Sequence, residues 1–273
     1  ATARPGAGTA FRRGALAVVV ALALAGVVAP FAAPAAPAVS GATADGPVVR
    51  HVDDDAGCGG AEPCYATIQA AVDASEDADI VRVAGGFYSE TVAVVDRSLV
   101  FDGPGFADPD PARHAVWSPA AAGDGRALLV DARSRDVSGV RVEGFRFLGG
   151  GVLVVARRQG DPIALPADLP ATLHDTVVSD TVVADNLFED ATTGGALTAY
   201  WADALVFVGN RVQGGRGPSL LGGSRQQVRD NVLRSVDVGV YLVVDGSDIS
   251  VAGNDLEGVR VGIMLGPLAD GKA

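Results

Sequence analysis

The segment VVADNLFED (residues 182–190) returns in shorter form as FVGNRV (207–212), VRDNVL (228–233) and VAGNDL (251–256). Each segment contains an Asn with an apolar residue three positions before it and another two positions after it. The Asn residues are Asn186, Asn210, Asn231 and Asn254, and successive ones lie 24, 21 and 23 positions apart (186 to 210, 210 to 231, 231 to 254). A short strand pattern with a period of about 20–25 residues is typical of a solenoid of stacked coils.

Stacking of such coils predicts that the four Asn residues lie in register inside the bends. A single coil cannot bury its apolar face alone, so each coil must pack on its neighbours. A buried Asn can then donate its amide to the Asn of the next coil, whereas an unpaired buried amide costs about 1–3 kcal/mol. We therefore expect an asparagine ladder that supports the fold and has no catalytic role.

The repeat extends toward the N-terminus. Residues 140–147 (VRVEGFRF) have the same strand, bend and strand pattern, with Gly144 at the bend. The polar stretch 157–174 contains three Pro residues, which predicts a long loop between two coils. Further upstream, Ile68, Ala71 and Val72 have helical spacing after a suitable N-cap residue, Thr67. A short helix there would cover the open apolar end of the solenoid.

The same region resembles a known superfamily. The segments TIQAAVDAS (67–75) and ADIVRVAGGFYSETVAV (78–94), together with the later Asn repeats, resemble right-handed parallel β-helix proteins of the pectate-lyase-like superfamily. The resemblance extends from Cys58 to the C-terminus. It implies an all-β fold, a right-handed single-stranded parallel β-helix with a short N-terminal capping helix.

The resemblance does not imply one activity. The superfamily includes lyases, esterases, epimerases, adhesins and surface proteins, and a fold alone does not determine function. The catalytic motifs of its pectin methylesterases, polygalacturonases and pectate lyases do not occur in this sequence.

The composition divides the chain into two parts. Residues 1–44 contain two adjacent Arg residues before an apolar stretch rich in small residues, and we interpret them as an export signal peptide with a spacer. An uncleaved N-terminal anchor is the alternative. Residues 45–273 form the predicted β-helix domain. We expect it to be incomplete at its C-terminal end, or covered there by another chain, because no capping helix follows the strand-like residues 263–265.

The only two cysteines, Cys58 and Cys64, predict a local disulfide in an exported protein, with two free thiols as the alternative. Asp53, Asp54 and Asp55 could supply ligands for Ca²⁺ or could form a solvated acidic linker. Three consecutive acids cannot all face one ion on an extended chain, which favours the linker. Bound Ca²⁺ is thus compatible with this sequence, but no specific motif supports it.

The formal net charge is −12, and it becomes −15 without residues 1–44, which contain three Arg and no acid. Such an acidic chain argues against nucleic acid and, after signal cleavage, against an anionic membrane as partner. It agrees with a soluble protein that is secreted to the extracellular space or the cell surface.

Alternation along the strands predicts which side chains face the core. We expect one set to point inward (Ala196, Thr198, Leu220, Val240, Leu242, Ile263 and Leu265) and another to point outward (Leu197, Ser219, Leu221, Tyr241 and Met264). Aromatic side chains on an outer face can stack on sugar rings, so Tyr200, Trp201 and Tyr241 are the predicted substrate-binding residues. Tyr200 and Trp201 could instead pack against a neighbouring loop.

Catalytic residues are less determined by the sequence. A lyase needs a base near a cation held by acids, and an inverting hydrolase needs two carboxyl groups about 6.5–9.5 Å apart. Because stacked coils repeat at about 4.8 Å, acids on one face can reach such distances. The candidates are Asp203, Arg225, Asp237 and Asp245. No residue is assigned as a metal ligand.

Two functions follow from these observations. The first is a secreted protein that binds a polysaccharide or cell-surface glycan, or acts on it as a lyase or hydrolase. The second is a non-catalytic extracellular solenoid with a binding or structural role, which the apolar outward side chains favour. Acids and bases gathered in one groove would favour an enzyme, and scattered charges would favour the second function.

Overall fold

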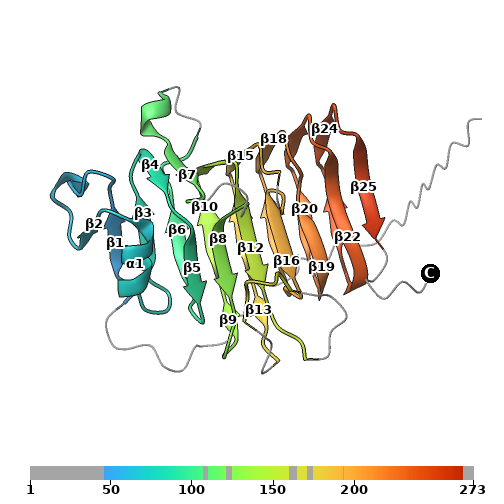
Figure 1. Cartoon of the computed structure of the whole chain (residues 1–273), viewed down its shortest axis with the longest axis horizontal. Coiled ribbons are helices and arrows are strands. Elements are labelled where there is room, and N and C mark those ends of the chain that lie inside the picture. The colour runs from blue at the N-terminus through green and yellow to red at the C-terminus, as the bar shows by residue number, and fades with distance from the viewer. Residues whose placement is uncertain are drawn as a thin grey trace, which may run out of the picture. The chain divides into compact units, whose positions relative to one another are not determined.

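The computed structural model describes residues 46–106, 110–120, 125–159, 165–170, 175–192 and 194–266 (Figure 1). The predicted export segment, residues 1–44, lies outside this described part. No helix within the described residues is long and apolar enough to cross a membrane.

Most strands belong to three sheets, which we name A, B and C. Sheet A contains, in spatial order, β2 (Cys64–Tyr65), β1 (Val49–Val52), β3 (Ile80–Val83), β6 (Val100–Asp102), β10 (Arg141–Glu143), β14 (Val182–Ala184), β17 (Val206–Val208), β20 (Gln227–Arg229) and β23 (Ser250–Ala252). Sheet B contains β4 (Gly86–Ser89), β7 (Ala115–Ser118), β11 (Phe145–Leu148), β15 (Leu187–Glu189), β18 (Arg211–Gln213), β21 (Val232–Arg234) and β24 (Asp255–Glu257). Sheet C contains β5 (Val92–Val95), β8 (Arg126–Asp131), β12 (Gly151–Val155), β16 (Leu197–Tyr200), β19 (Ser219–Ser224), β22 (Val238–Ser247) and β25 (Val261–Gly266). A separate short pair joins β9 (Val137–Ser138) and β13 (Val178–Ser179).

The chain visits the three sheets in turn. β14, β15 and β16 lie in sheets A, B and C, and β17, β18 and β19 repeat that order one coil later. Each strand pairs in parallel with its equivalents in the neighbouring coils, as Phe188 of β15 does with Phe147 and Val212. Figure 1 shows the resulting row of strands between the helix and β25. The predicted all-β parallel solenoid is therefore confirmed.

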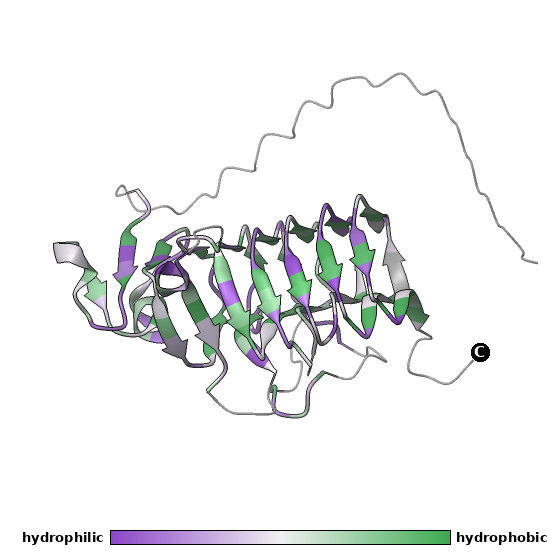
Figure 2. Cartoon of the chain, turned by 90° about the horizontal axis from the view of Figure 1, so that it is seen from above, coloured by the Kyte–Doolittle hydropathy of each residue, from purple (hydrophilic) through white to green (hydrophobic). Residues whose placement is uncertain are grey.

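The inward side chains form one continuous core. Aromatic residues lie above one another along sheet B, where the rings of Trp117 and Phe147 are 5.4 Å apart and those of Phe147 and Phe188 are 4.8 Å apart. All three side chains are fully buried. Polar and apolar residues alternate along many strands (Figure 2), the pattern of a sheet with one buried face.

The asparagine ladder is present at the bend between sheets A and B. Asn210 Oδ1 accepts hydrogen bonds from the backbone N (3.0 Å) and Nδ2 (3.2 Å) of Asn186. Asn231 accepts the same pair from Asn210, and Asn254 accepts it from Asn231. Each Nδ2 also donates to a backbone carbonyl of a neighbouring coil. At the upstream end, Asn186 Oδ1 accepts the N–H of Phe145 at 3.0 Å.

The residue before each ladder Asn has a left-handed backbone, and its identity alternates along the stack. Asp185, Gly209, Asp230 and Gly253 have φ values of 52°, 66°, 56° and 66°. A Cβ at Gly209 would lie 2.3 Å from Asp185 Oδ1, and one at Gly253 would lie 2.4 Å from Asp230 Oδ1. Each Asp side chain therefore folds over the following coil, where only Gly leaves room for it.

The predicted inward and outward faces are wrong in one coil. Leu197 is fully buried, whereas Thr198 is partly exposed and in register with Ser219 of the outer face. The sequence predicted that Leu197 would correspond to Ser219, but the register pairs Thr198 with Ser219 and Ala199 with Leu220. The connection before β16 is therefore one residue longer than expected. In the later coils, the predicted inward orientation is confirmed for Leu220 and Val240, whose side chains are buried. Ile263 and Leu265 continue these rows, but in this last described strand their exposed fractions are 53% and 65%.

The helix α1 (Ile68–Ala74) begins after Thr67, whose Oγ1 accepts the N–H of Ala70 at 3.2 Å. Its residues Ile68, Ala71 and Val72 belong to the core. The carboxylate of Glu90 accepts the N–H groups of Ile68 (2.8 Å) and Gln69 (2.9 Å) at the first turn. The helical spacing in the sequence coincides with α1, whereas the role of this helix as a cap of the solenoid stays a prediction.

The segment before α1 contains the predicted Cys58–Cys64 disulfide. Each of the three acids at residues 53–55 accepts a backbone N–H group, and Asp54 and Asp55 are exposed, which agrees with the expected solvated stretch. Asp53 accepts from Cys58 (3.0 Å), Asp54 from Phe87 (3.0 Å) and Asp55 from Gly57 (2.7 Å).

Candidate functional site

The outer face of sheet C is rich in apolar side chains, and the long loop covers one part of it. Leu165 and Leu169 of this loop pack on a small second core made by Leu129, Leu153 and Val155. The register of sheet C places outward residues of the later strands, such as Ser219 and Tyr241, in line with Leu153. The loop thus divides the outer face into a covered part and an open part.

A buried ion pair fastens the loop. Arg157 Nη2 donates to both carboxylate oxygens of Asp131, at 2.6 and 2.7 Å, and both side chains are fully buried. Arg157 Nη1 donates to the carbonyl of Pro170 at 2.5 Å. Asp131 also pairs with Arg133, whereas Asp131 is the only ion-pair partner of Arg157 among the described residues. Because loss of Asp131 would leave the buried Arg157 charge unpaired, this contact fixes the loop over sheet C.

A pocket of about 190 Å³ lies between this loop and sheet C, and its lining includes Arg126, Asp168, Thr198 and Tyr200. Arg126 Nη2 is 2.5 Å from Asp168 Oδ2. The hydrogen bond from Arg126 lowers the pKa of Asp168, which keeps this carboxylate ionised. Burial raises the pKa of Tyr200, so its hydroxyl remains a hydrogen-bond donor at neutral pH.

A second pocket, of about 320 Å³, opens farther along the same face. Its side chains come from three successive coils and include Arg216, Ser219, Asp237, Tyr241, Arg260 and Met264. Ser219, Tyr241 and Met264 are register partners on β19, β22 and β25, so they form one wall.

Three charged residues also line this pocket, and we name them the charged row: Arg216, Asp237 and Arg260. They occupy the turn that enters sheet C in successive coils. Asp237 N donates to the Gly215 carbonyl (2.8 Å), and Arg260 N donates to the Val236 carbonyl (3.2 Å). This backbone register places a positive, a negative and a positive side chain side by side.

Asp237 and Arg260 are paired. Arg260 donates from Nε (2.5 Å) and Nη2 (3.0 Å) to the two carboxylate oxygens of Asp237. The hydrogen bond lowers the pKa of Asp237 and raises that of Arg260. Among the described residues, Arg216 has no ion-pair partner of its own, although its charge also lowers the pKa of Asp237. The row therefore has an excess of positive charge and a guanidinium that is free to bind an anion.

The two pockets adjoin. Thr198 lines the first and Ser219 lines the second, and these residues are register partners on β16 and β19. The combined surface runs from Arg126 on β8 to Arg260 before β25, across the parallel strands. We name it the sheet C groove.

The structure separates the predicted substrate-binding residues. Tyr200 and Tyr241 line the sheet C groove. Trp201 has an exposed fraction of only 7%, and a Cβ at Gly222 in the next coil would lie 2.5 Å from its ring. The guanidinium of Arg158 lies 4.5 Å from the centroid of the Trp201 ring. Trp201 thus packs between the next coil and the start of the long loop.

The four catalytic candidates do not form one cluster. Asp203 follows β16, at the opposite end of the sheet C strands from Asp237, which precedes β22. Arg225 Nε lies 3.2 Å from Asp203 Oδ1, Ser224 Oγ donates to the same oxygen at 2.5 Å, and the hydrogen bond from Arg225 lowers the pKa of Asp203. Asp245 lies in β22, and its side chain is outside the description.

Sequence reasoning missed Arg126, Asp168, Arg216 and Ser219 as members of one surface. A signal for Arg216 was available, because Gly217, Gly239 and Gly262 begin equivalent segments and each has a charged residue one or two positions before it. No local pattern indicates that the loop returns Asp168 to Arg126, since the two residues are 42 positions apart.

Within the described residues, no group of three or more His, Cys, Asp or Glu side chains could hold a metal ion. No protein-family model, no curated protein and no solved structure matches this chain.

Proposed function

We propose that this chain is a secreted, right-handed parallel β-helix protein of the pectate-lyase-like superfamily, capped by α1, that binds an acidic polysaccharide in the sheet C groove. The observation that carries the proposal is the charged row beside an aromatic wall. Arg216 and Arg260 stand on either side of Asp237, and Tyr241 and Met264 line the same pocket. Guanidinium groups bind carboxylates in a bidentate manner, and tyrosine rings stack on sugar faces.

The dimensions support an extended ligand. The groove crosses five strand intervals, from β8 to β25, which corresponds to about 24 Å at about 4.8 Å per interval. The segments that carry Arg216 and Arg260 are two intervals apart, or about 10 Å. Repeated cations along such a groove suit a linear chain whose sugar carboxylates recur at regular intervals. All cations of the groove are arginines, and Lys272 is the only lysine in the whole sequence.

The electrostatics favour binding over catalysis. A glycosidase needs one carboxyl group with a raised pKa that can act as an acid. In the groove, the pKa values of Asp168 and Asp237 are both lowered, in each case chiefly by a hydrogen bond from Arg. Carboxylates in this state orient guanidinium groups, and they are weak bases and poor proton donors.

Calorimetric titration of the purified chain tests this function. We expect a linear oligogalacturonate to bind at least tenfold more tightly than a neutral oligosaccharide of equal length. Arg216→Gln should weaken oligogalacturonate binding about tenfold, whereas Arg229→Gln, an exposed arginine on sheet A, should not. Equal affinity for both sugars, or unchanged binding by Arg216→Gln, would overturn the proposal. Release of an unsaturated, ultraviolet-absorbing sugar would show instead that the groove is a lyase site.

A further inference from the structure

A further pocket, which is separate from the sheet C groove, lies on the outer face of sheet A. Its volume is about 470 Å³, within the range of about 300–1,000 Å³ that small-molecule sites occupy. Its lining includes His51, Cys58, Arg82, Asp102 and Pro104.

The floor of this pocket is a row of polar side chains in strict register. β1, β3 and β6 are neighbours in sheet A, where His51 pairs with Arg82 and Arg82 pairs with Asp102. Neighbouring side chains in such a row are about 5 Å apart. On the other side of His51, the register partner is Cys64, so one half of the disulfide lies on the strand next to His51.

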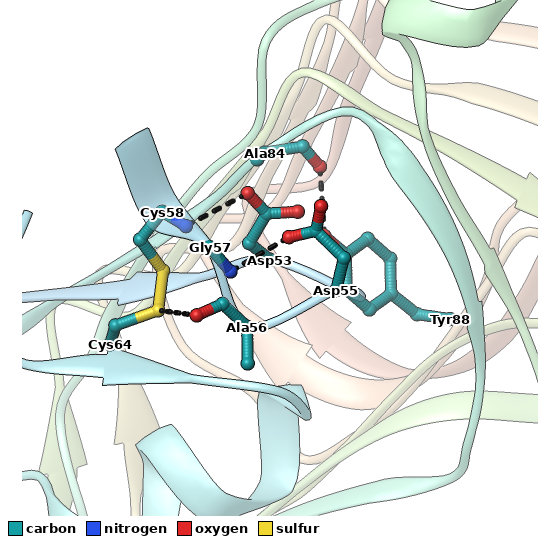
Figure 3. The surroundings of a disulfide bond; sticks show 8 residues. All are labelled: Asp53, Asp55, Ala56, Gly57, Cys58, Cys64, Ala84 and Tyr88. Carbon is teal, nitrogen blue, oxygen red and sulfur yellow. Dashed lines mark hydrogen bonds between the residues drawn. A yellow bond between two sulfur atoms is a disulfide. The ribbon is translucent and has the colours of Figure 1, made fainter. Parts of the chain in front are cut away.

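The disulfide loop forms one wall. Cys58 and Gly59 line the pocket, and their positions are fixed by the bond to Cys64 and by Asp53 Oδ2, which accepts the N–H of Cys58 at 3.0 Å (Figure 3). Ala56 and Cys58 have left-handed φ values of 58° and 43°, a conformation that non-glycine residues avoid without such support. Pro104 also lines the pocket, so its ring adds apolar surface to that of the disulfide loop.

The floor offers unused donors. Arg82 donates from Nε to Asp102 Oδ2 at 2.9 Å, and this contact leaves both Nη groups without an acceptor among the described residues. The imidazole of His51 likewise has no hydrogen-bond partner among the described residues. A guanidinium edge and an imidazole on adjacent strands are suited to grip the two oxygens of one carboxylate.

We propose that this pocket binds a small carboxylate-bearing molecule with an apolar, ring-sized body. The carboxylate lies between His51 and Arg82, and the apolar body contacts the disulfide and Pro104. A phosphate dianion suits the site less, because Asp53 and Asp102 lie in the same pocket and would repel its second charge.

Two-dimensional NMR of the full chain tests the site with benzoate as the probe and benzyl alcohol as its neutral counterpart. Benzoate should shift the imidazole signals of His51, identified by their loss in His51→Gln, and the amide signals of Cys58 and Gly59. Benzyl alcohol should bind at least tenfold more weakly. Phenyl phosphate should also bind more weakly than benzoate. Equal shifts with benzyl alcohol, or tighter binding of phenyl phosphate, would overturn the proposal.

Matched variants test which residues of the pocket contribute to benzoate binding. Arg82→Gln should weaken benzoate binding about tenfold or more, and Arg141→Gln, which removes a comparable exposed arginine of sheet A, should leave it unchanged. The double variant Cys58→Ser, Cys64→Ser should also lose benzoate binding, because without the disulfide the loop that carries Cys58 and Gly59 is no longer held at the pocket. Full affinity in Arg82→Gln or in the double variant would refute the site. Oligogalacturonate binding should be unaffected by Arg82→Gln, so the two proposals can fail independently.

Discussion

Four successive coils each supply one residue to the asparagine ladder. The last three of these coils also supply one residue each to the charged row. The ladder repeats a single residue type at a bend where Asn186 and Asn210 have no exposed surface. The charged row contains two Arg residues and one Asp at an exposed turn. The two regions thus have the same spacing along the solenoid and opposite solvent environments.

This difference shows what fixes a residue in a repeat. A buried amide must find its partners in the coils above and below, so the four successive coils from Asn186 to Asn254 share one residue type there. An exposed turn carries no such constraint, because water satisfies any polar group placed in it. Side chains of the exposed row are therefore free to differ from coil to coil, which leaves this row available for recognition of a ligand.

Substitution within the ladder should have the largest effect on stability. In Asn210→Ala, Asn186 loses its acceptor and the carbonyl of Val183 loses its donor. We expect a loss of about 3–5 kcal/mol in the free energy of unfolding, measured by urea denaturation, because several buried groups are left unpaired. Gln213→Ala, an exposed change in the same coil, should cost less than about 0.5 kcal/mol. Similar costs for the two variants would contradict the structural role of the ladder.

Gly209→Ala should have the next largest effect, at the turn that positions Asn210. The left-handed backbone alone costs about 1–2 kcal/mol for a residue with a Cβ. Contact with Asp185 Oδ1 adds to this cost. In the background of Asp185→Gly, the same substitution should therefore be milder, and a double-mutant cycle measures the coupling. Additive effects would show that the alternation of Asp and Gly has no steric origin.

Prediction from sequence succeeded where a buried requirement repeats and failed where contacts are not periodic. The ladder, the solenoid, the helix at Ile68–Ala74 and the disulfide each leave a local signal. The reversal of Leu197 and Thr198 arose from one additional residue in an irregular connection. The joining of Arg126 to Asp168 depends on the path of a long loop, and burial of Trp201 depends on a Gly in the next coil. None of these contacts has a fixed spacing that a pattern could reveal.

Asp96 is intermediate between the buried asparagine ladder and the exposed charged row, since it is a partly buried carboxylate at a turn after β5. Burial opposes its ionisation, but hydrogen bonds from Ser134 and from the backbone of Arg133 and Arg135 lower its pKa below the usual value. Its contribution is therefore complete above the unfolded pKa of about 3.9 and is lost as the pH falls through the folded value. Asp96→Asn should cost about 1–2 kcal/mol at pH 7, and this cost should shrink below about pH 4. A cost that does not change with pH would show that the carboxylate charge is not involved.

Asp237→Asn should have the smallest effect on stability and a distinct effect on binding. Asp237 is partly exposed and pairs with the exposed Arg260, so we expect no measurable change in the urea midpoint. Loss of its charge releases Arg260 and removes repulsion of an acidic ligand, so oligogalacturonate should bind severalfold more tightly, and the gain should decrease with added salt. Asp255→Asn is the matched control, because Asp255 pairs with Arg234 on sheet B, outside the groove. If both variants strengthen binding equally, the gain reflects net charge alone, and the charged row has no more influence on the ligand than any other exposed pair on this acidic protein.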